Sequence, residues 1–136
     1  MMGLMYDKGE GVTQDYKEAG KWYRLAAEER VATAQFQLGL MYERGQGVTQ
    51  DYKEAEKWFR LSAEQEIAQA QFNMGGIYYI GQGVPRDQVL AYIWMNIASS
   101  NGNKNAIQFR NLLEKKMSPQ QIEEAQRLAR NWKPKK

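Results

Sequence analysis

Apolar residues recur at helical spacing in pairs of neighbouring segments. Over residues 32–44, Ala34, Leu38 and Tyr42 follow one another at intervals of four, which places them on one face of a helix. A turn separates this helix from a second one, predicted over residues 52–64. The apolar stripe of the second helix consists of Ala55, Trp58, Phe59 and Ser62.

The whole pattern returns with a period of 36 residues. A fixed period of this size is typical of a stacked repeat array, in which one helix pair cannot bury its apolar face alone and neighbouring pairs supply the core. The sequence therefore predicts an all-α solenoid of helix-turn-helix repeats. The second-helix stripe recurs as Ala19, Trp22, Tyr23 and Ala26, and again as Ala91, Trp94, Met95 and Ala98.

Glycines stand at fixed places in each repeat. Gly39 and Gly75 lie in mid-helix, where glycine costs about 1 kcal/mol relative to alanine. Their recurrence indicates close contact with the partner helix. Gly45 follows the last turn of its helix and is expected to end it in the left-handed conformation. Gly47 gives the turn a second permissive position.

The second helices carry start signals. Asp51 is predicted as an N-cap, and Glu54 as the capping-box partner that bonds back to it. Asp15 and Glu18 repeat this pair 36 residues earlier.

The two ends of the array differ. After residue 102 the repeat fades into a helix over residues 104–117, and Ser118 and Pro119 then begin a final helix with a polar outer face, which closes a solenoid end. At the other end, residues 1–7 supply only a short first helix, so the apolar side chains of Leu4, Tyr6 and Trp22 form an open edge. Either upstream residues or another chain would cover this edge.

The chain is predicted to form one domain, 1–136. It is divided into a partial repeat 1–30, repeats 31–66 and 67–102, a divergent C-terminal helical pair 103–132 and a tail 133–136.

Composition narrows the function classes. The 136 residues are 43% hydrophobic and 26% charged, as in a globular protein. There is no cysteine and no histidine, so disulfides, thiolate metal sites and the usual general base near neutral pH are missing. We expect no enzymatic activity and no cofactor. No apolar run reaches the ~18 residues of a membrane span, and the start lacks the apolar core of a signal peptide, so a cytoplasmic location is expected.

Charge is unevenly distributed. Residues 1–103 carry a net charge of −3, and residues 104–136 carry +6. A basic end can meet nucleic acid, but the basic residues do not interleave with exposed aromatic residues, which makes a nucleic-acid partner unlikely on sequence grounds.

Three motifs that suggest chemistry have simpler structural interpretations. The Gly45–Gly47 pair lacks the third glycine and the preceding strand of a dinucleotide site. The tryptophans at 22, 58 and 94 fall on the buried stripe and are predicted to be core residues. The third motif is a set of acidic residues expected to be surface charges at helix ends: Glu28, Glu29, Glu64 and Glu66.

The first helix of each repeat has a second face, opposite its core positions. This face mixes amides, which can pair with a peptide backbone, with apolar residues that need a cover. It is our candidate partner-binding surface, although ordinary exposed residues explain it equally well. Its members are Thr33, Gln37, Leu40 and Arg44, then Gln69, Asn73, Gly76 and Ile80, and finally Asn105, Phe109, Leu112 and Lys116.

The recurring pattern from Ala34 through Gly45, Gly47, Asp51 and Trp58 to Ala63 resembles the Sel-one-like repeat family, relatives of the tetratricopeptide repeats. The ending, residues 117–136, is similar to the closing helix of bacterial members. The resemblance implies a right-handed α/α superhelix whose first helices line a concave groove, with an adaptor role. The family usually has glycine at the positions of Arg30 and Glu66, so these turns are expected to be altered.

Together these features predict a non-enzymatic scaffold that binds a peptide or protein segment in its concave groove. The alternative is a structural protein that forms homo-oligomers through its open N-terminal edge.

Overall fold

The computed structural model describes residues 12–130, with side chains from residue 15 onward. This range contains only α-helices, and no strand is present in it. The all-α prediction is therefore confirmed. The helices are α2 (Val12–Glu28), α3 (Ala32–Arg44), α4 (Tyr52–Glu64), α5 (Ala68–Ile80), α6 (Gln88–Ser100), α7 (Lys104–Lys116) and α8 (Pro119–Arg130).

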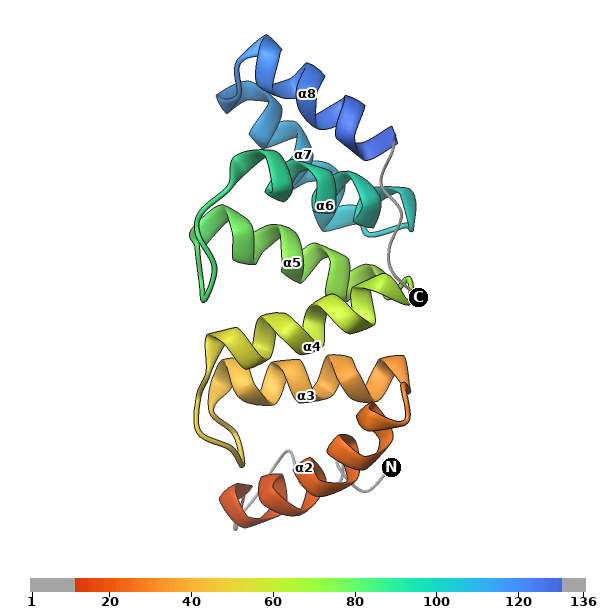
Figure 1. Cartoon of the computed structure of the whole chain (residues 1–136), viewed down its shortest axis with the longest axis vertical. Helices are drawn as coiled ribbons and strands as arrows, with labels where there is room; N and C mark the ends of the chain where they lie inside the picture. The colour runs from red at the N-terminus through yellow and green to blue at the C-terminus, as the bar shows by residue number, and fades with distance from the viewer. Residues whose placement is uncertain (1–11, 131–136) are drawn as a thin grey trace.

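Successive helices stack along the long axis of the molecule (Figure 1). The largest contacts join α3 to α4 and α5 to α6, and smaller contacts join α2 to α3, α4 to α5 and α6 to α7. The chain is thus a solenoid of helical pairs, as the period predicts. We call α3, α5 and α7 the first helices and α2, α4 and α6 the second helices. The predicted short helix over residues 1–7, with Leu4 and Tyr6, lies outside the described range.

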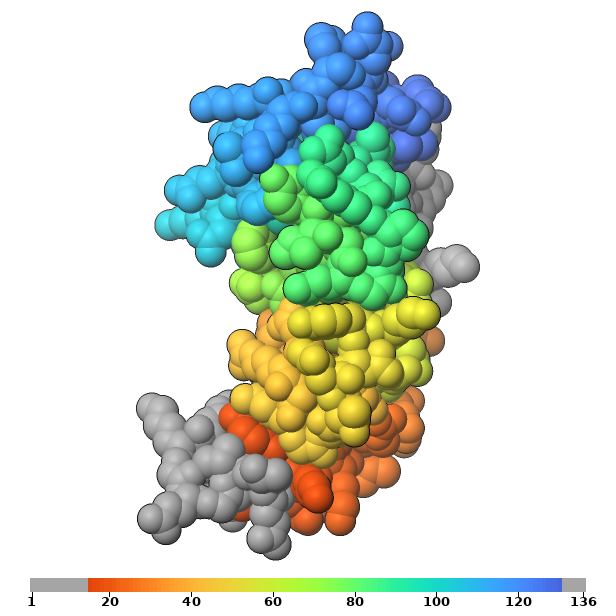
Figure 2. Space-filling model, turned by 90° about the vertical axis from the view of Figure 1, so that its left-hand side faces the viewer, coloured from red at the N-terminus to blue at the C-terminus, as the bar shows by residue number. Residues whose placement is uncertain are grey.

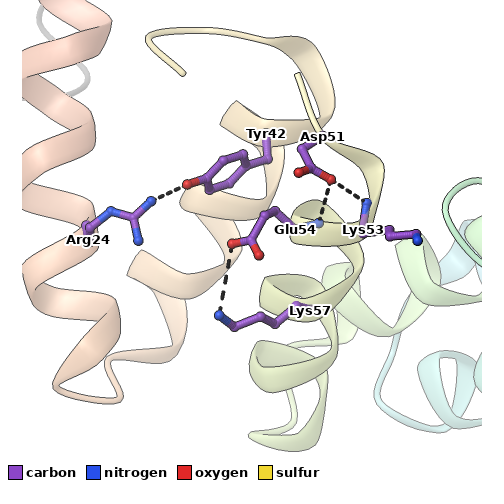
Figure 3. A network of polar contacts seen from close by, with 6 residues as sticks. All are labelled: Arg24, Tyr42, Asp51, Lys53, Glu54 and Lys57. Carbon is purple, nitrogen blue, oxygen red and sulfur yellow. Dashed lines mark hydrogen bonds and ion pairs between the residues drawn. The ribbon is translucent and has the colours of Figure 1, made fainter. Parts of the chain in front are cut away.

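The helix ends follow the expected signals with one correction. Gly45 closes α3 in the left-handed region, with φ of 69°. Asp51 caps α4 by accepting hydrogen bonds from the backbone N–H groups of Lys53 and Glu54, at 3.0 and 3.2 Å (Figure 3). The reciprocal bond expected from the Glu54 side chain does not form. The Asp51 N–H instead donates to the Tyr42 carbonyl at 3.0 Å.

The same prediction fails in the first repeat for a different reason. α2 begins at Val12, so Asp15 lies inside its first turn and does not precede the helix as an N-cap. An acidic residue there still interacts favourably with the positive end of the helix dipole.

Close helix contacts explain the mid-helix glycines. A Cβ atom on Gly39 would lie 2.7 Å from Cδ1 of Phe59, and one on Gly75 would lie 2.7 Å from Cε of Met95. Both distances are too short for real atoms, which confirms the predicted contact with the partner helix. Gly47 serves a contact between repeats, because a Cβ there would lie 2.5 Å from the backbone carbon of Tyr16.

The turns at Arg30 and Glu66 keep a left-handed conformation without glycine, with φ of 67° and 70°. The expectation that these turns are altered is therefore wrong for the backbone. Gln65 supports the first turn, since its Nε2 donates to the Arg30 carbonyl at 3.1 Å. The left-handed conformation costs a non-glycine residue roughly 1–2 kcal/mol, so such support is needed.

Buried amides link neighbouring repeats. Gln35 donates to the Ala27 carbonyl at 3.2 Å and accepts from Gln65 at 2.9 Å. One repeat later, Gln71 donates to the Ala63 carbonyl at 3.1 Å and accepts from Asn101 at 2.8 Å. Because buried amides must keep their partners, these bonds fix how each repeat sits on the one before it.

The tryptophans do not share one environment. Trp58 and Trp94 are 5% and 2% exposed, as predicted, but Trp22 is 54% exposed, so its assignment to the core is wrong. Trp58 is buried against Ala27 and Leu38, which belong to α2 and α3. The position equivalent to Leu38 for Trp22 is residue 2, outside the described range. Burial of this tryptophan therefore depends on a preceding helical layer.

At the other end, α8 closes the stack. It packs against α6, and its buried Ala125 joins Ala91 and Met95 in one core cluster, with Ile122 and Ala129 packed around it. Leu128 of the same helix is exposed. The C-terminal end is thus covered by a helix with a polar outer face, as predicted.

Candidate functional site

The predicted face of the first helices is open. None of its twelve residues is buried, whereas Ala34, Leu38 and Ala70 on the opposite side of these helices are. Figure 2 shows α3, α5 and α7 along one side of the stack, where α7 projects and the surface over α5 and α3 is recessed below it. We call this surface the first-helix face. It consists of Thr33, Gln37, Leu40, Arg44, Gln69, Asn73, Gly76, Ile80, Asn105, Phe109, Leu112 and Lys116.

Gly76 adds no side chain to this face, and we call the open space beside it the notch. A Cβ atom built on it would have no heavy atom within 4 Å apart from its immediate surroundings on the helix. The neighbouring apolar side chains are exposed, with Ile80 62% and Leu112 46% accessible. Gly76 stands where the adjacent repeats have Leu40 and Leu112, so an apolar side chain of a partner can occupy the space that a leucine fills elsewhere.

Two members of the face also support the fold. Leu40 is half-buried and packs against the core cluster around Ala55 and Phe59. Phe109 is half-buried as well, and its ring meets the rings of Phe72 and Tyr79 edge-on, at centroid distances of 6.5 and 5.1 Å. These two residues form the floor of the face and do not stand free on it.

Amides lie at the N-terminal end of α5. Gln69 donates to Asn73 at 3.3 Å, and Asn103 donates to Gln69 at 3.3 Å. These side chains keep further donors and acceptors that can pair with an extended backbone. Gln37 and Thr33 continue the polar surface onto α3.

Cations lie at the C-terminal end of α5. Lys116 donates from Nζ to the Tyr79 hydroxyl at 3.0 Å, and its Nζ is 5.6 Å from the centre of the Tyr79 ring. The guanidinium carbon of Arg86 is 5.5 Å from the same ring centre. The hydrogen bond from Lys116, the charge of Lys116 and the charge of Arg86 lower the pKa of the Tyr79 hydroxyl below its usual value.

Sequence reasoning missed Tyr79, Arg86 and Phe72 at this site. Tyr79 and Phe72 lie three residues after and four residues before Gly76, so helical spacing places them beside the notch. Arg86 lies in the turn before α6, and no periodic pattern indicates where its side chain points.

Other polar groups stabilise junctions between helices. Arg24 of α2 donates to the Tyr42 hydroxyl of α3 (Figure 3). In the next repeat, Glu56 is buried and lies 3.8 Å from Arg60. Burial raises the pKa of the Glu56 carboxyl above its usual value, and the charge of Arg60 offsets part of that effect. None of these four residues belongs to the first-helix face.

Two of the acidic residues treated as separate surface charges share one cleft. Glu28 and Glu64 both line a cleft of about 410 Å³ together with Trp58 and Leu61. Their side chains come from the C-terminal turns of α2 and α4. Arg30 lines the same cleft and supplies a positive charge within it.

Metal binding and membrane insertion find no support in the described range. Over residues 12–130, no three acidic side chains gather as a metal site would need. Within the same range, no helix is both long and apolar enough to cross a membrane. The predictions of no enzymatic activity and of a cytoplasmic location stay predictions.

Comparison with known proteins identifies the repeat. The family model for the Sel1 repeat matches residues 1–30, 32–66 and 68–103. A crystal structure of c5321, a protective antigen present in uropathogenic Escherichia coli strains that displays an SLR fold, matches with a TM-score of 0.89 and 38% identity over 95% of this chain. A Sel1 repeat protein from Oxalobacter formigenes matches with a TM-score of 0.73 and 40% identity over 81% of the chain.

This chain spans only part of those structures, 28% of the first and 45% of the second. Comparison with curated protein sequences found no match. The Sel1 model nevertheless covers most of the chain, and both structural relatives share its fold. The protein therefore belongs to the Sel1 repeat family, whose members are generally protein-interaction scaffolds.

Proposed function

We propose that this protein is a non-enzymatic scaffold that holds an extended segment of a partner protein on its first-helix face. The open notch at Gly76 carries the proposal. On the second helices the apolar stripe is covered by neighbouring helices, as at Phe59 and Met95, but at Gly76 the space beside the helix is empty.

The chemistry of the face fits an extended peptide. An extended chain presents unpaired backbone groups along both edges, and amide side chains can pair with them. Gln69 and Asn73 stand one turn apart on α5, next to the notch, so backbone pairing and side-chain insertion can occur together. Apolar contact would supply most of the affinity, because Ile80 and Leu112 are the most exposed apolar residues of the face.

Substitution of Gly76 by leucine tests the proposal. The side chain has room and leucine raises helix propensity, so the variant should fold normally. It should fill the notch and weaken binding of proteins captured from a native extract by tenfold or more. Glu124→Leu is the matched control, because it adds an exposed leucine to α8, away from the face. Equal capture by wild type and Gly76→Leu would show that the notch is not the binding site.

A second function, self-association through the N-terminal edge, is favoured by a separate observation. Trp22 and Leu25 are 54% and 59% exposed and lie three residues apart on α2, so they form one apolar patch. Patches of this kind usually mark a contact site. Sedimentation velocity should show a dimer that Trp22→Glu dissociates and Leu112→Glu does not. A monomer at high concentration excludes this function.

A further inference from the structure

We infer that the part of the first-helix face between α5 and α7 selects an acidic peptide, in which a carboxylate lies within a few positions of a bulky apolar residue, before or after it. The inference deepens the proposed function and depends on it. The juxtaposition that carries it is an empty apolar notch beside two cations that have no carboxylate partner.

The notch and the cations belong to one continuous surface. Gly76 lies three residues before Tyr79 and four before Ile80, so all three share a helix face. Tyr79 contacts Phe109 of α7, and it also accepts the hydrogen bond from Lys116 of α7. A ligand side chain in the notch is therefore a direct neighbour of the Tyr79 ring and of the cations around it.

The two cations lack a counter-charge. Within residues 15–130, neither Lys116 nor Arg86 has a carboxylate oxygen within 4.0 Å, whereas Lys21, Lys57 and Arg60 each have one. The acidic residues nearest to them in sequence have other partners. Asp87 caps α6 by accepting from the Leu90 N–H at 3.0 Å, and Glu114 accepts from the Tyr92 hydroxyl at 2.6 Å. The hydrogen bond from Lys116, together with the charges of Lys116 and Arg86, lowers the pKa of the Tyr79 hydroxyl. An anion supplied by a partner would relieve the repulsion between two like charges held at one ring.

The rest of the face does not offset this charge. Its twelve residues include the cations Arg44 and Lys116 and no aspartate or glutamate. A basic peptide would be repelled along the face, while an acidic one would be attracted. Nucleic acid fits less well, because single-stranded nucleic acid needs a basic path with stacking platforms and the aromatic rings here are packed edge-on against one another.

The spacing of features along α5 sets the spacing of groups in the ligand. Along α5, the amides come first, the notch follows, and the cations lie beyond the C-terminal turn. Gly76 and Ile80 are about 6 Å apart along the helix axis, at a rise of about 1.5 Å per residue. An extended peptide advances about 3.3 Å per residue, so a carboxylate about two to four residues from the apolar anchor reaches the cations.

Fluorescence anisotropy with defined peptides tests the inference on the full chain. The probes are labelled nonapeptides of serine and asparagine with leucine or phenylalanine at position 5. Glutamate is placed at position 1, 2, 3, 7, 8 or 9, and the matched probes carry lysine or glutamine there. We expect the best glutamate peptide to bind at least tenfold more tightly than its lysine counterpart. This preference should weaken as salt rises from 50 to 200 mM.

Charge reversal gives the sharper readout. Lys116→Glu combined with Arg86→Glu should reverse the preference, so that the lysine peptide binds more tightly. Lys116→Met, which removes one charge and keeps an unbranched side chain, should reduce the preference by at least threefold. Lys53→Glu on α4 is the matched control and should leave it unchanged. Thermal unfolding of each variant checks that the fold is kept.

The outcomes separate the inference from the proposed function. If peptides shift the amide NMR signals of Gly76 and Ile80 whatever their charge, the face binds peptides and the acidic preference is wrong. If none of the peptides binds, the inference is also wrong, and loss of partner capture by Gly76→Leu still decides the proposed function. Tighter binding of an oligonucleotide than of any acidic peptide would likewise overturn the inference.

Discussion

Two adjacent glycines show how different the two faces of α5 are. Gly75 lies against α6, where an added Cβ would come within 2.7 Å of Met95, while Gly76 has no neighbour within 4 Å of the same atom. One glycine is required by close packing, and the other leaves a space that the fold does not use. α5 is therefore closely packed on its core side and open on its outer side.

The tryptophans at 22 and 58 give the same contrast between repeats. They occupy equivalent positions, yet one is 54% exposed and the other 5%. Both are tryptophans within a second helix, so the difference comes from the layer that covers Trp58. Position in the array, and not the repeat motif, decides which apolar residues are available to a partner.

The largest expected effect is at Trp58. Trp58→Ala should lower the free energy of unfolding by about 3–5 kcal/mol, because it removes a large buried aromatic side chain. Trp22→Ala should cost less than about 1 kcal/mol, as for other exposed positions. Urea denaturation of both variants measures the difference. Similar losses at the two sites would contradict the assignment of Trp22 to an exposed position.

The next largest effect is the difference in stability between variants of Gly75 and Gly76. Gly75→Leu should destabilise the protein by about 1–3 kcal/mol, since its side chain has to displace Met95 from the core. Gly76→Leu should be neutral or stabilise the fold by up to about 1 kcal/mol through helix propensity. Chemical denaturation of the two variants tests this pair. If Gly76→Leu is the more destabilising variant, its side of α5 faces the core.

The smallest effect concerns pH and the packed side of α4. Because burial raises the pKa of Glu56 above its usual 4.5, the folded state holds a proton there that the unfolded chain has released. Wild-type stability should therefore fall as pH rises from about 4.5 through the raised pKa. Glu56→Gln should reduce that fall, and the part that remains comes from Glu43, whose pKa is also raised by burial. Glu123→Gln, at an exposed position of α8, should leave the fall unchanged. The free energy of unfolding of each protein is measured between pH 4 and 8. Identical pH profiles for wild type and Glu56→Gln would contradict the predicted role of Glu56.

Much of the fold could be predicted because the same pattern of apolar residues and glycines recurs in successive repeats. Spacing of Ala34, Leu38 and Tyr42 defined the core side of α3, and the open face followed by elimination. The capping-box error at Glu54 arose because the Asp51 N–H already pairs with the Tyr42 carbonyl. That bond joins a turn to the preceding helix and has no local sequence signal.

Less of the candidate site could be predicted. Gly76 and Ile80 followed from helical spacing on one helix. The arrangement of Arg86 and Lys116 around Tyr79 joins a turn to another repeat, and it depends on side-chain conformations that periodicity does not determine. The buried amides at positions 35 and 71 had a usable signal, since glutamine recurs beside the core alanines 36 residues apart.

Site-specific photocrosslinking tests most directly whether the first-helix face binds a partner. A photoreactive phenylalanine analogue replaces Ile80 on the face and, in a second variant, Lys57 on the exposed side of α4. Illumination in native extract should give a defined protein adduct from position 80. That adduct should be lost when Gly76→Leu is added, and it should be missing from position 57. Equal adducts from both positions, or an adduct at position 80 that survives Gly76→Leu, would contradict the assignment of binding to this face.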